Sequence, residues 1–338
     1  MRLSVIIPHA GSPTLKACLR SVVESVVFSK IPSEILVVDD RVRDVSPPPL
    51  TTSDLVRMIT LQTSGREGFA AAVNTGARAA TGELLLILND DVTLDLSCVS
   101  ALCQATVKRP LAAAFQARVR SAKDLTRFDY AGAAGGLIDR YGYPYCLGRV
   151  LFSTDVDRGQ FDTDQRIFWT SGCAMLVRSE DYRATGGLYE GFGMHMEEID
   201  LCWRLWRSGR ECWSAPLAIV FHEGGATLAR GSFRKAWWNH RNHWMLIFRN
   251  LPARRLQGAV AIRLTLDSAE LLWSLSTLKW RNAAAVLCAM PWPLFNICRL
   301  RHARRDAQGP YELPATAPVY PRSIVMDAIR DRVHGVAP

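Results

Sequence analysis

Short apolar runs alternate with stretches of helical periodicity along the first hundred residues. The runs LSVIIP, EILVVDD, MITLQT and ELLLILNDD occupy residues 3–8, 34–40, 58–63 and 83–91. Between them, apolar side chains recur at helical spacing over 13–28, and the Ala-rich segment 68–82 closes at Gly82. Continuous apolar runs are typical of strands buried on both faces of a sheet. The alternation therefore predicts βαβ units in a mostly parallel, doubly wound α/β sheet with flanking helices.

Polar residues follow three of these strands at the point where each strand ends. They are Pro8 and His9, the pair Asp39 and Asp40, and the trio Asn89, Asp90 and Asp91. Ligands bind beyond the carboxyl ends of strands in open parallel sheets, and acids gathered there repel one another unless a cation lies among them. Hard oxygen ligands suit Mg²⁺ or Mn²⁺, which would in turn hold a diphosphate. A single acidic strand end is explained equally well as a helix cap, but three together favour a site.

Beyond residue 110 the pattern is less regular. The segment 110–168 includes the Gly-rich stretch 131–148, which we expect to form loops and short strands around a substrate pocket. Within 167–188 we expect a strand and then a helix over 180–185 with Ser179 as its N-cap.

Two later segments carry candidate chemistry. Glu197, Glu198 and Asp200 stand at the start of an expected helix, and a strand within 211–225 ends at His222. Acids in a first helical turn are also favoured by the helix dipole, so ordinary capping is the alternative explanation for them. A lone His is more often structural, but one that ends a buried strand is a candidate ligand.

The composition changes between Arg234 and Arg305. Thirteen Lys and Arg stand against two acids there, a balance of +11 compared with +9 for the whole chain. The segment also holds six of the ten Trp: Trp237, Trp238, Trp244, Trp273, Trp280 and Trp292. Basic residues interleaved with Trp and Leu are typical of amphipathic helices at an anionic membrane surface. We therefore expect membrane-associating helices over 231–307, with packing on the preceding domain or a homo-oligomer interface as alternatives.

Neither the longest apolar run nor the tail predicts a membrane span. The run over 283–298 is broken by Pro291 and Pro293 and is shorter than the roughly 20 residues that a spanning helix needs. A re-entrant or interfacial helix stays open there. The tail over 308–338 contains four Pro by residue 321 and is expected to be extended.

The cysteines and the N-terminus bear on the compartment. Nine Cys show neither CxxC nor zinc-ligand spacing, and many, such as Cys18, Cys173 and Cys288, have apolar neighbours. We expect reduced, buried thiols in a cytosolic protein. The apolar run before Pro8 is too short for a signal peptide.

Six pieces of sequence, in order, resemble glycosyltransferase family 2. They are SVIIPHAG (4–11), ILVVDD (35–40), GREGFAAAVNTGARAATGELLLILNDDV (65–92), WTSGCAMLVR (169–178), GGLYEGFGMHMEEIDLCWRLWRSGR (186–210) and APLAIVFHEGGAT (215–227). The resemblance is strongest to the bacterial rhamnosyltransferase-like branch. It implies a GT-A (Rossmann-like) catalytic domain over 1–230, with a nucleotide-binding half over 1–110 and an acceptor half over 111–230.

The resemblance also implies a role for each matching position. The residues expected at the sugar-nucleotide donor are Pro8, His9, Asp39, Asp40, Arg66, Gly68, Asn74, Asn89 and Asp90. Trp169, Gly172 and Glu197 are expected on the acceptor side. Asp91, in the family's DxD motif, and His222 would ligate Mg²⁺ or Mn²⁺. Glu198 would be the general base, and Asp200 would help to place the acceptor or the helix.

Several positions depart from the usual family pattern. Asn89 replaces the first Asp of DxD, Glu198 stands where the base is usually Asp, and Arg66 stands where many relatives have Asn. His9 and Gly11 replace the more usual residues after the first-strand Pro. These departures concern the identity of the base and the choice of donor more than the reaction class.

The implied reaction is inverting, metal-dependent transfer of a sugar from a nucleotide-diphosphate donor to a hydroxyl of a glycan or lipid-linked glycan. It would serve cell-surface polysaccharide synthesis, with the protein peripheral on the inner face of the bacterial plasma membrane. Rhamnose from dTDP-rhamnose is the expected sugar, and galactofuranose or another hexose from a UDP donor is the alternative.

Three other functions are weighed against this one. A nucleotidyltransferase would need a Gly-rich basic loop after the first strand, and PHAGSPTLKACL has one Gly and one Lys. Asn89 and Glu198 keep a non-catalytic, sugar-nucleotide-binding relative open. Nucleic-acid binding is disfavoured because the basic segment resembles no groove-reading motif.

Overall fold

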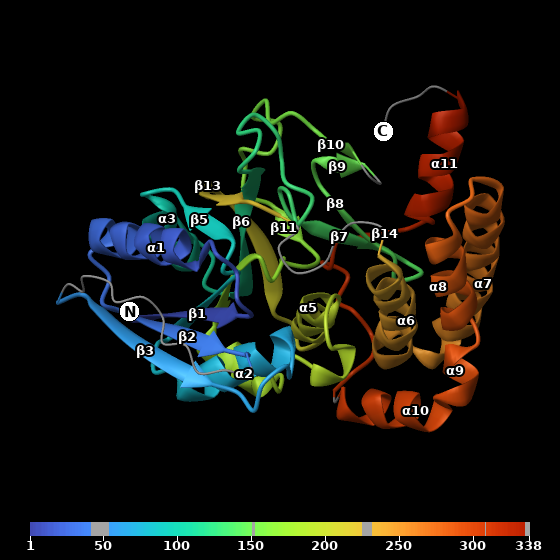
Figure 1. The fold of residues 1–338 in the computed structure, drawn as a ribbon, viewed down its shortest axis with the longest axis horizontal. Helices are drawn as coiled ribbons and strands as arrows, with labels where there is room; N and C mark the ends of the chain where they lie inside the picture. Colours follow the sequence, from blue (N-terminus) through green and yellow to red (C-terminus); the bar gives the residue numbers. More distant parts are fainter. Residues whose placement is uncertain (42–53, 151–152, 225–231, 308, 335–338) are drawn as a thin grey trace.

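The computed structural model describes residues 1–41, 54–150, 153–224, 232–307 and 309–334. The expected match over 215–227 therefore lies partly outside the described residues. A nine-stranded mixed sheet forms the centre of the N-terminal part of the chain (Figure 1). Among the described residues its path runs β11-β13-β6-β12-β4-β1-β2-β3, with β5 paired to β13. The strands are β1 Leu3–His9, β2 Ser33–Asp39, β3 Val56–Gln62, β4 Leu84–Leu88, β5 Val92–Leu94, β6 Ala112–Ser121, β11 Arg166–Ile167, β12 Ala174–Arg178 and β13 Glu211–His222.

The expected α/β fold is confirmed, with a sheet that is more mixed than mostly parallel. β4, β1, β2 and β3 run parallel, as their apolar runs predict. β12 inserts antiparallel between β4 and β6, and β6 then pairs in parallel with β13. β1, β2 and β4 are buried almost throughout, because helices cover both faces of this sheet.

Two hydrophobic cores lie on the two sides of the sheet. One contains apolar residues of α1 Leu15–Ser29 and α3 Cys98–Lys108. The other contains residues of α2 Phe69–Ala79, α4 Ser179–Ala184, the 3₁₀ turn η1 Glu190–Phe192 and α5 Glu197–Arg207. Ser179 is the first residue of α4 and makes no side-chain cap, so its prediction as the N-cap is wrong.

A second, smaller sheet corrects the expectation for the middle region and the tail. Its strands are β7 Gly136–Asp139, β8 Pro144–Cys146, β9 Arg149–Val150, β10 Ser153–Thr154 and β14 Val319–Tyr320, in the order β10-β9-β8-β7-β14. β14 comes from the tail and pairs in parallel with β7, and the helix α11 Ile324–His334 follows it. The tail is therefore not simply extended. The middle region also contributes β6, a buried ten-residue strand, to the large sheet.

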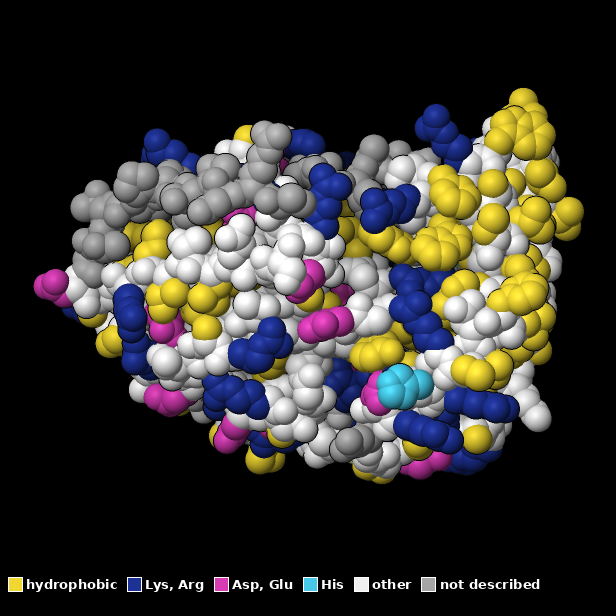
Figure 2. Space-filling view, turned by 60° about the horizontal axis from the view of Figure 1, so that its bottom comes forward, with side chains coloured by type: hydrophobic (Ala, Val, Ile, Leu, Met, Phe, Trp, Pro, Cys, Tyr) yellow, Lys and Arg dark blue, Asp and Glu magenta, His cyan; other side chains and the backbone are white. Residues whose placement is uncertain are grey.

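A layer of helices forms the C-terminal end of the molecule (Figure 1). Its members are α6 Phe233–Asn250, α7 Ala253–Ser276, α8 Trp280–Ala289, α9 Trp292–Phe295 and α10 Ile297–Asp306. α6 joins this layer to the core on the α5 side through Trp244, Met245, Leu246 and Ile247. Hydrophobic side chains gather on the surface at this end of the molecule, with Lys and Arg beside them (Figure 2).

Two expectations about this layer have mixed outcomes. No single helix of the described residues is long and apolar enough to cross a bilayer. The two segments Trp280–Phe295 and Ile297–Asp306 meet that test when they are taken together, by length and composition alone, and they are bent by 75° relative to each other.

All nine Cys are free thiols, but Cys288 and Cys298 are exposed, so the expectation of a buried Cys288 is wrong.

A close helix–strand contact yields a prediction about packing. A Cβ on Gly76 of α2 would lie 2.5 Å from Ile6 Cγ2, so α2 rests directly on β1. We expect Gly76→Ala to lower the free energy of unfolding by about 1–3 kcal/mol through overpacking. The matched control is Gly258→Ala on α7, where a Cβ meets nothing within 4 Å. It should raise stability by about 0.5–1 kcal/mol. Urea denaturation measures both, and equal effects would contradict the contact.

Candidate functional site

The polar ends of three neighbouring strands meet at one edge of the large sheet. β1 lies between β4 and β2, and His9 is in register with Asp39. The amide of Asp40 donates to the His9 carbonyl at 2.9 Å, and His9 Nδ1 lies 2.6 Å from Asp90 Oδ2. The expected convergence of His9, Asp39, Asp40 and Asp90 is therefore present.

Asp40 organises the loop that follows β3. Its carboxylate accepts from the amides of Glu67 and Gly68, at 2.8 and 2.9 Å, and from the Thr63 hydroxyl at 2.6 Å. Its carbonyl accepts from the amide of Arg66, a residue with φ of 57° and an exposed side chain. Asp39 instead binds Arg41.

Asp91, His222 and Asp129 form a buried row beside these strand ends. His222 Nε2 lies 3.2 Å from Asp91 Oδ1, and Nδ1 lies 2.7 Å from Asp129 Oδ1. Burial lowers the pKa of His222, but the hydrogen bonds that its ring donates to Asp129 and Asp91 outweigh burial and raise the pKa to about 9. The two carboxylates therefore favour positive charge at this ring, and a metal ion on Nε2 would supply that charge in place of the proton.

The donor atoms of this row fit a divalent cation. Asp91 offers a carboxylate and His222 an imidazole, and Asp129 fixes the second ring nitrogen of His222. Such a carboxylate–histidine pair is a common outer-shell arrangement around protein metals. Asn89 and Asp90 precede Asp91 on the same turn and are half-buried. Asp129 was not predicted, because nothing in its local sequence separates it from other loop acids.

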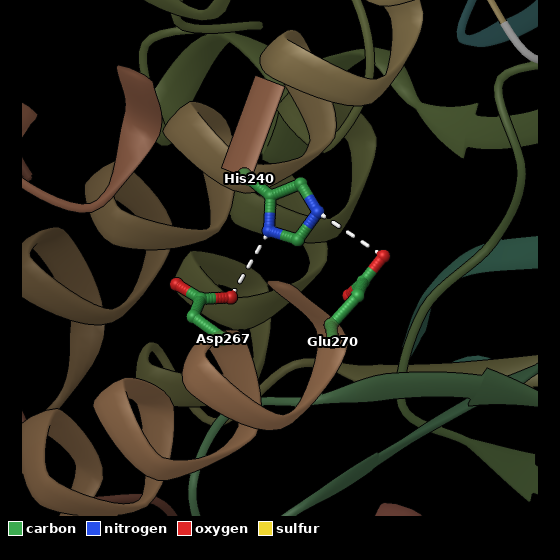
Figure 3. Close-up of side chains that lie close together, drawn as sticks. All are labelled: His240, Asp267 and Glu270. Atoms are coloured by element: carbon green, nitrogen blue, oxygen red, sulfur yellow. Dashed lines mark hydrogen bonds and ion pairs between the residues drawn. The ribbon is translucent and has the colours of Figure 1, made fainter. Parts of the chain in front are cut away.

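A different set of three side chains among the described residues is also close enough to share a metal. His240 of α6 lies 3.0 Å from Asp267 and 3.6 Å from Glu270, both of α7 (Figure 3). The Arg263 guanidinium donates to both His240 and Asp267, at 2.7 and 2.9 Å. Because Arg263 already supplies a cation there, we assign this set to an ion-pair network within the helical layer.

Two close backbone approaches join the strand ends to the second half of the site. A Cβ on Gly68 would lie 3.0 Å from the carbonyl of Gly193, and a Cβ on Gly172 would lie 2.9 Å from the ring of Phe69. The loops that contain Gly172 and Gly193 therefore rest against the start of α2. Gly193 belongs to the loop that leads into α5.

Glu197 and Glu198 begin α5 after two residues in the left-handed region. His195 and Met196 have φ of 70° and 74°, a conformation that costs non-Gly residues free energy and that the surroundings must maintain. The atoms His195 Nε2, Glu197 Oε2 and Glu198 Oε2 are buried without a hydrogen-bond partner among the described residues. Burial raises the pKa of Glu197 well above its usual range and that of Glu198 to about 7.

α6 holds this strained loop from the other side. The Asn242 amide nitrogen donates to the carbonyls of Phe192, Met194 and His195, at 3.2, 2.6 and 2.8 Å. Arg241 donates to Phe192 at 2.7 Å as well. Three carbonyls that converge on one amide fix the path of the chain into Glu197. Sequence reasoning missed both residues, because their partners lie about 50 positions away.

Asp200 ties α5 to α6 one turn further on. Its carboxylate is fully buried and accepts from Arg204, Arg249 and Asn250, at 2.9, 2.8 and 2.7 Å. Burial by itself raises the pKa of Asp200, but the Arg204 and Arg249 charges outweigh it and lower the pKa to about 2. Because protein groups already bind the Asp200 carboxylate, the geometry favours a role in positioning the helix. It does not favour contact with a ligand.

Two residues predicted for the site, Asn74 and Trp169, make their side-chain contacts with residues other than the strand-end acids. Asn74 binds Tyr182, Leu188 and Glu190 through its side-chain amide. Together these residues line a surface cavity near α2 and α4. Trp169 is 5% exposed, and its indole nitrogen donates to the Leu137 carbonyl. Pro8, by contrast, lies in β1 beside the site.

Comparison with known proteins identifies the relatives of this chain. Residues 4–182 match the model of the family described as Glycosyl transferase family 2. An N-acetylglucosaminyl-diphospho-decaprenol L-rhamnosyltransferase of Mycobacterium tuberculosis is 24% identical over 283 residues, covering 77% of this chain and 90% of the relative. Rhamnosyltransferase WbbL of Escherichia coli K12 is 26% identical over 187 residues, covering 55% of this chain and 68% of the relative.

A solved structure supports the fold. The crystal structure of GalNAc-T7 with UDP, GalNAc and Mn²⁺ matches with a TM-score of 0.55 at 14% identity. The match covers 88% of this chain and 57% of that one. At this identity the likeness concerns the fold alone, which is that of the GT-A glycosyltransferases.

The Asp200 network yields a prediction about stability. We expect Asp200→Asn to lower the free energy of unfolding by about 3–5 kcal/mol, because it leaves Arg204 and Arg249 buried without their counter-charge. Urea denaturation measures the change. The control is Asp124→Asn, which removes an acid from an exposed pair with Arg127 and should leave the midpoint unchanged. Similar midpoints for the two variants would contradict the network.

Proposed function

The chain belongs to glycosyl transferase family 2 and is a glycosyltransferase, and from that premise we propose that it transfers a sugar with inversion at the anomeric carbon. The donor is a nucleotide-diphosphate sugar and the acceptor is a hydroxyl of a glycan or lipid-linked glycan. The observation that carries this proposal is the start of α5. A carboxylate with an unpartnered buried oxygen and a raised pKa stands there, next to the loop that joins the two halves of the site.

Glu198 acts as the general base in this proposal. It takes the proton from the acceptor hydroxyl as that oxygen attacks the anomeric carbon from the face opposite the leaving diphosphate. A base with a pKa near 7 is half ionised at neutral pH and still accepts a proton effectively. Glu197, buried beside it, is held protonated by burial and by the charge of its neighbour, and contributes to the acceptor side.

The strand ends hold the donor. Asp40 shapes the loop that carries Arg66 and Gly68 toward the nucleoside, and His9 and Asp90 lie under the diphosphate. Asp91 and His222 hold Mg²⁺ or Mn²⁺ through the donor atoms described above, with Asp129 orienting His222. Mg²⁺ or Mn²⁺ held by these residues would neutralise the charge that develops on the leaving diphosphate.

The names of the relatives support a proposal for the sugar and the acceptor. The names of the relatives from M. tuberculosis and E. coli both specify rhamnosyl transfer, which favours dTDP-rhamnose as the donor. The mycobacterial relative is named for a decaprenol-linked acceptor. We therefore propose a lipid-linked acceptor, a role in cell-surface polysaccharide synthesis and a peripheral position on the inner face of the bacterial plasma membrane.

Donor binding tests the strand-end site. We expect calorimetry with UDP-, dTDP- and GDP-sugars to find one nucleotide class that binds with Mg²⁺ or Mn²⁺ and weakly without it. Asp91→Asn should reduce the metal-dependent affinity by at least about tenfold, since it removes a charged ligand oxygen. The control Asp124→Asn should bind as the wild type does. Unchanged metal dependence in Asp91→Asn would remove Asp91 from the site, and no binding of any of these donors would contradict the strand ends as a donor site.

The pH dependence of transfer tests the base. We expect turnover to rise as the pH is raised through about 7, where Glu198 loses its proton, and then to level off. Glu198→Gln should lower turnover by about 10²–10⁴-fold while donor affinity is kept. The control is Glu180→Gln, on the exposed side of α4, and should have no effect. Near-normal turnover in Glu198→Gln would assign the base elsewhere.

A further inference from the structure

Over most of its length, helix α7 has apolar residues on its exposed face and charged residues on its buried face. From residue 256 to residue 278 none of its exposed positions carries a charged side chain, and the exposed large residues are Leu264, Leu272, Trp273, Leu275 and Leu278. A surface helix in water normally turns its charged residues outward and its apolar residues toward the core. The reversal over six turns indicates that the medium outside α7 is not water.

Between residues 256 and 276 the charged residues of α7 are Arg263, Asp267 and Glu270, and each of them pairs within the helical layer. Arg263 and Asp267 are buried and paired at 2.9 Å, and Glu270 reaches His240 of α6 (Figure 3). Arg263 also bonds His243 at 2.9 Å, and Asn282 of α8 donates to Glu270 at 2.9 Å. The ionisable groups of α6 and α7, with the Asn282 amide of α8, thus satisfy one another inside the layer. This is the arrangement expected where the outer face contacts hydrocarbon.

The same character continues over α8 and α9. No charged residue occurs between Arg281 and Arg299. Leu287, Leu294 and Phe295 are among the most exposed large apolar residues of the described chain, the last two at 78% and 84%. Together with the exposed residues of α7 and Trp280, they form one apolar surface, which we call the α7–α9 face. It lies at the end of the molecule where Figure 2 shows hydrophobic side chains gathered.

Positive charge stands only at the ends of the α7–α9 face. Arg254 and Arg255 precede it, Lys279 and Arg281 lie at the α7–α8 turn, and Arg299 follows it. Lys279 lies 3.8 Å from the ring centre of exposed Trp273. Basic residues and Trp that flank an apolar surface match the headgroup level of an anionic membrane.

We propose that the α7–α9 face inserts into the acyl region of one leaflet of an anionic lipid membrane, with its basic ends at the phosphates. The inference deepens the proposed function and rests on it only for the expectation that this membrane carries the acceptor. A second copy of the chain is the rival occupant. The charge pattern favours lipid, since two copies that buried this face against each other would bring their basic ends together.

Vesicle flotation with the full-length protein tests the proposal. We expect binding to vesicles of phosphatidylcholine with phosphatidylglycerol, much weaker binding to phosphatidylcholine alone, and a blue shift of Trp fluorescence on the anionic vesicles. The double variant Leu294→Glu with Phe295→Glu should lose at least about tenfold in partition, because it replaces two exposed apolar side chains with carboxylates that the acyl region excludes. The matched control is Leu111→Glu with Leu217→Glu. Both of its positions are at least 70% exposed and lie outside the helical layer, and it should partition as the wild type does.

Two outcomes would overturn the proposal. Equal loss in both double variants, or no binding of the wild type to anionic vesicles, would remove lipid as the occupant. A wild-type dimer in sedimentation that Leu294→Glu with Phe295→Glu converts to monomer, without vesicle binding by either, would assign the face to a second copy. None of these measurements uses a sugar donor, so failure here leaves the proposed transfer reaction standing, and failure of transfer leaves this test intact.

Discussion

The buried contact between α5 and α6 is the interaction on which the rest of this structure depends. The Asp200 carboxylate accepts hydrogen bonds from Arg249 and Asn250 of α6, and Arg249 also donates to the carbonyl of Ala303 in α10. A carboxylate removed from water is stable only with such full compensation. The position of α5 is thus fixed by the helical layer that follows it in the chain, rather than by the large sheet alone.

The same contact explains how a strained loop persists at the site. His195 and Met196 have left-handed backbone conformations that would relax if the loop were free. Asn242 donates to three carbonyls of this loop, and Arg241 donates to a fourth, that of Gly191. α6 therefore performs two tasks with one face. It secures α5 through Asp200, and it sets the direction in which Glu197 and Glu198 enter the site.

The strands that could be predicted are those whose own sequence is a continuous apolar run. β1, β2 and β4 followed from their apolar runs, and the convergence of their polar ends followed from parallel topology. β6 was missed because its Ala-rich run has little strand signal, and β14 because its partner β7 lies about 180 residues earlier. Asp129, Arg241 and Asn242 were missed for a related reason, since only tertiary contact distinguishes them. The basic residues of the C-terminal third were predicted to belong to amphipathic helices at an anionic membrane surface, but Arg241, Arg249 and Arg263 are buried and bonded inside the layer.

The pairing of β14 with β7 has a consequence for the order of folding during synthesis. β7 lies between β8 and β14, so one of its edges stays without a strand until residues 319 and 320 have left the ribosome. Strands β1 to β4, by contrast, come from the first 88 residues and need no late segment to pair with one another. The part of the chain that contains β1 to β4 can thus form its parallel strands while translation continues. The small sheet is completed only after residues 319 and 320 have been made, and until then its open edge is exposed to pairing with a foreign strand.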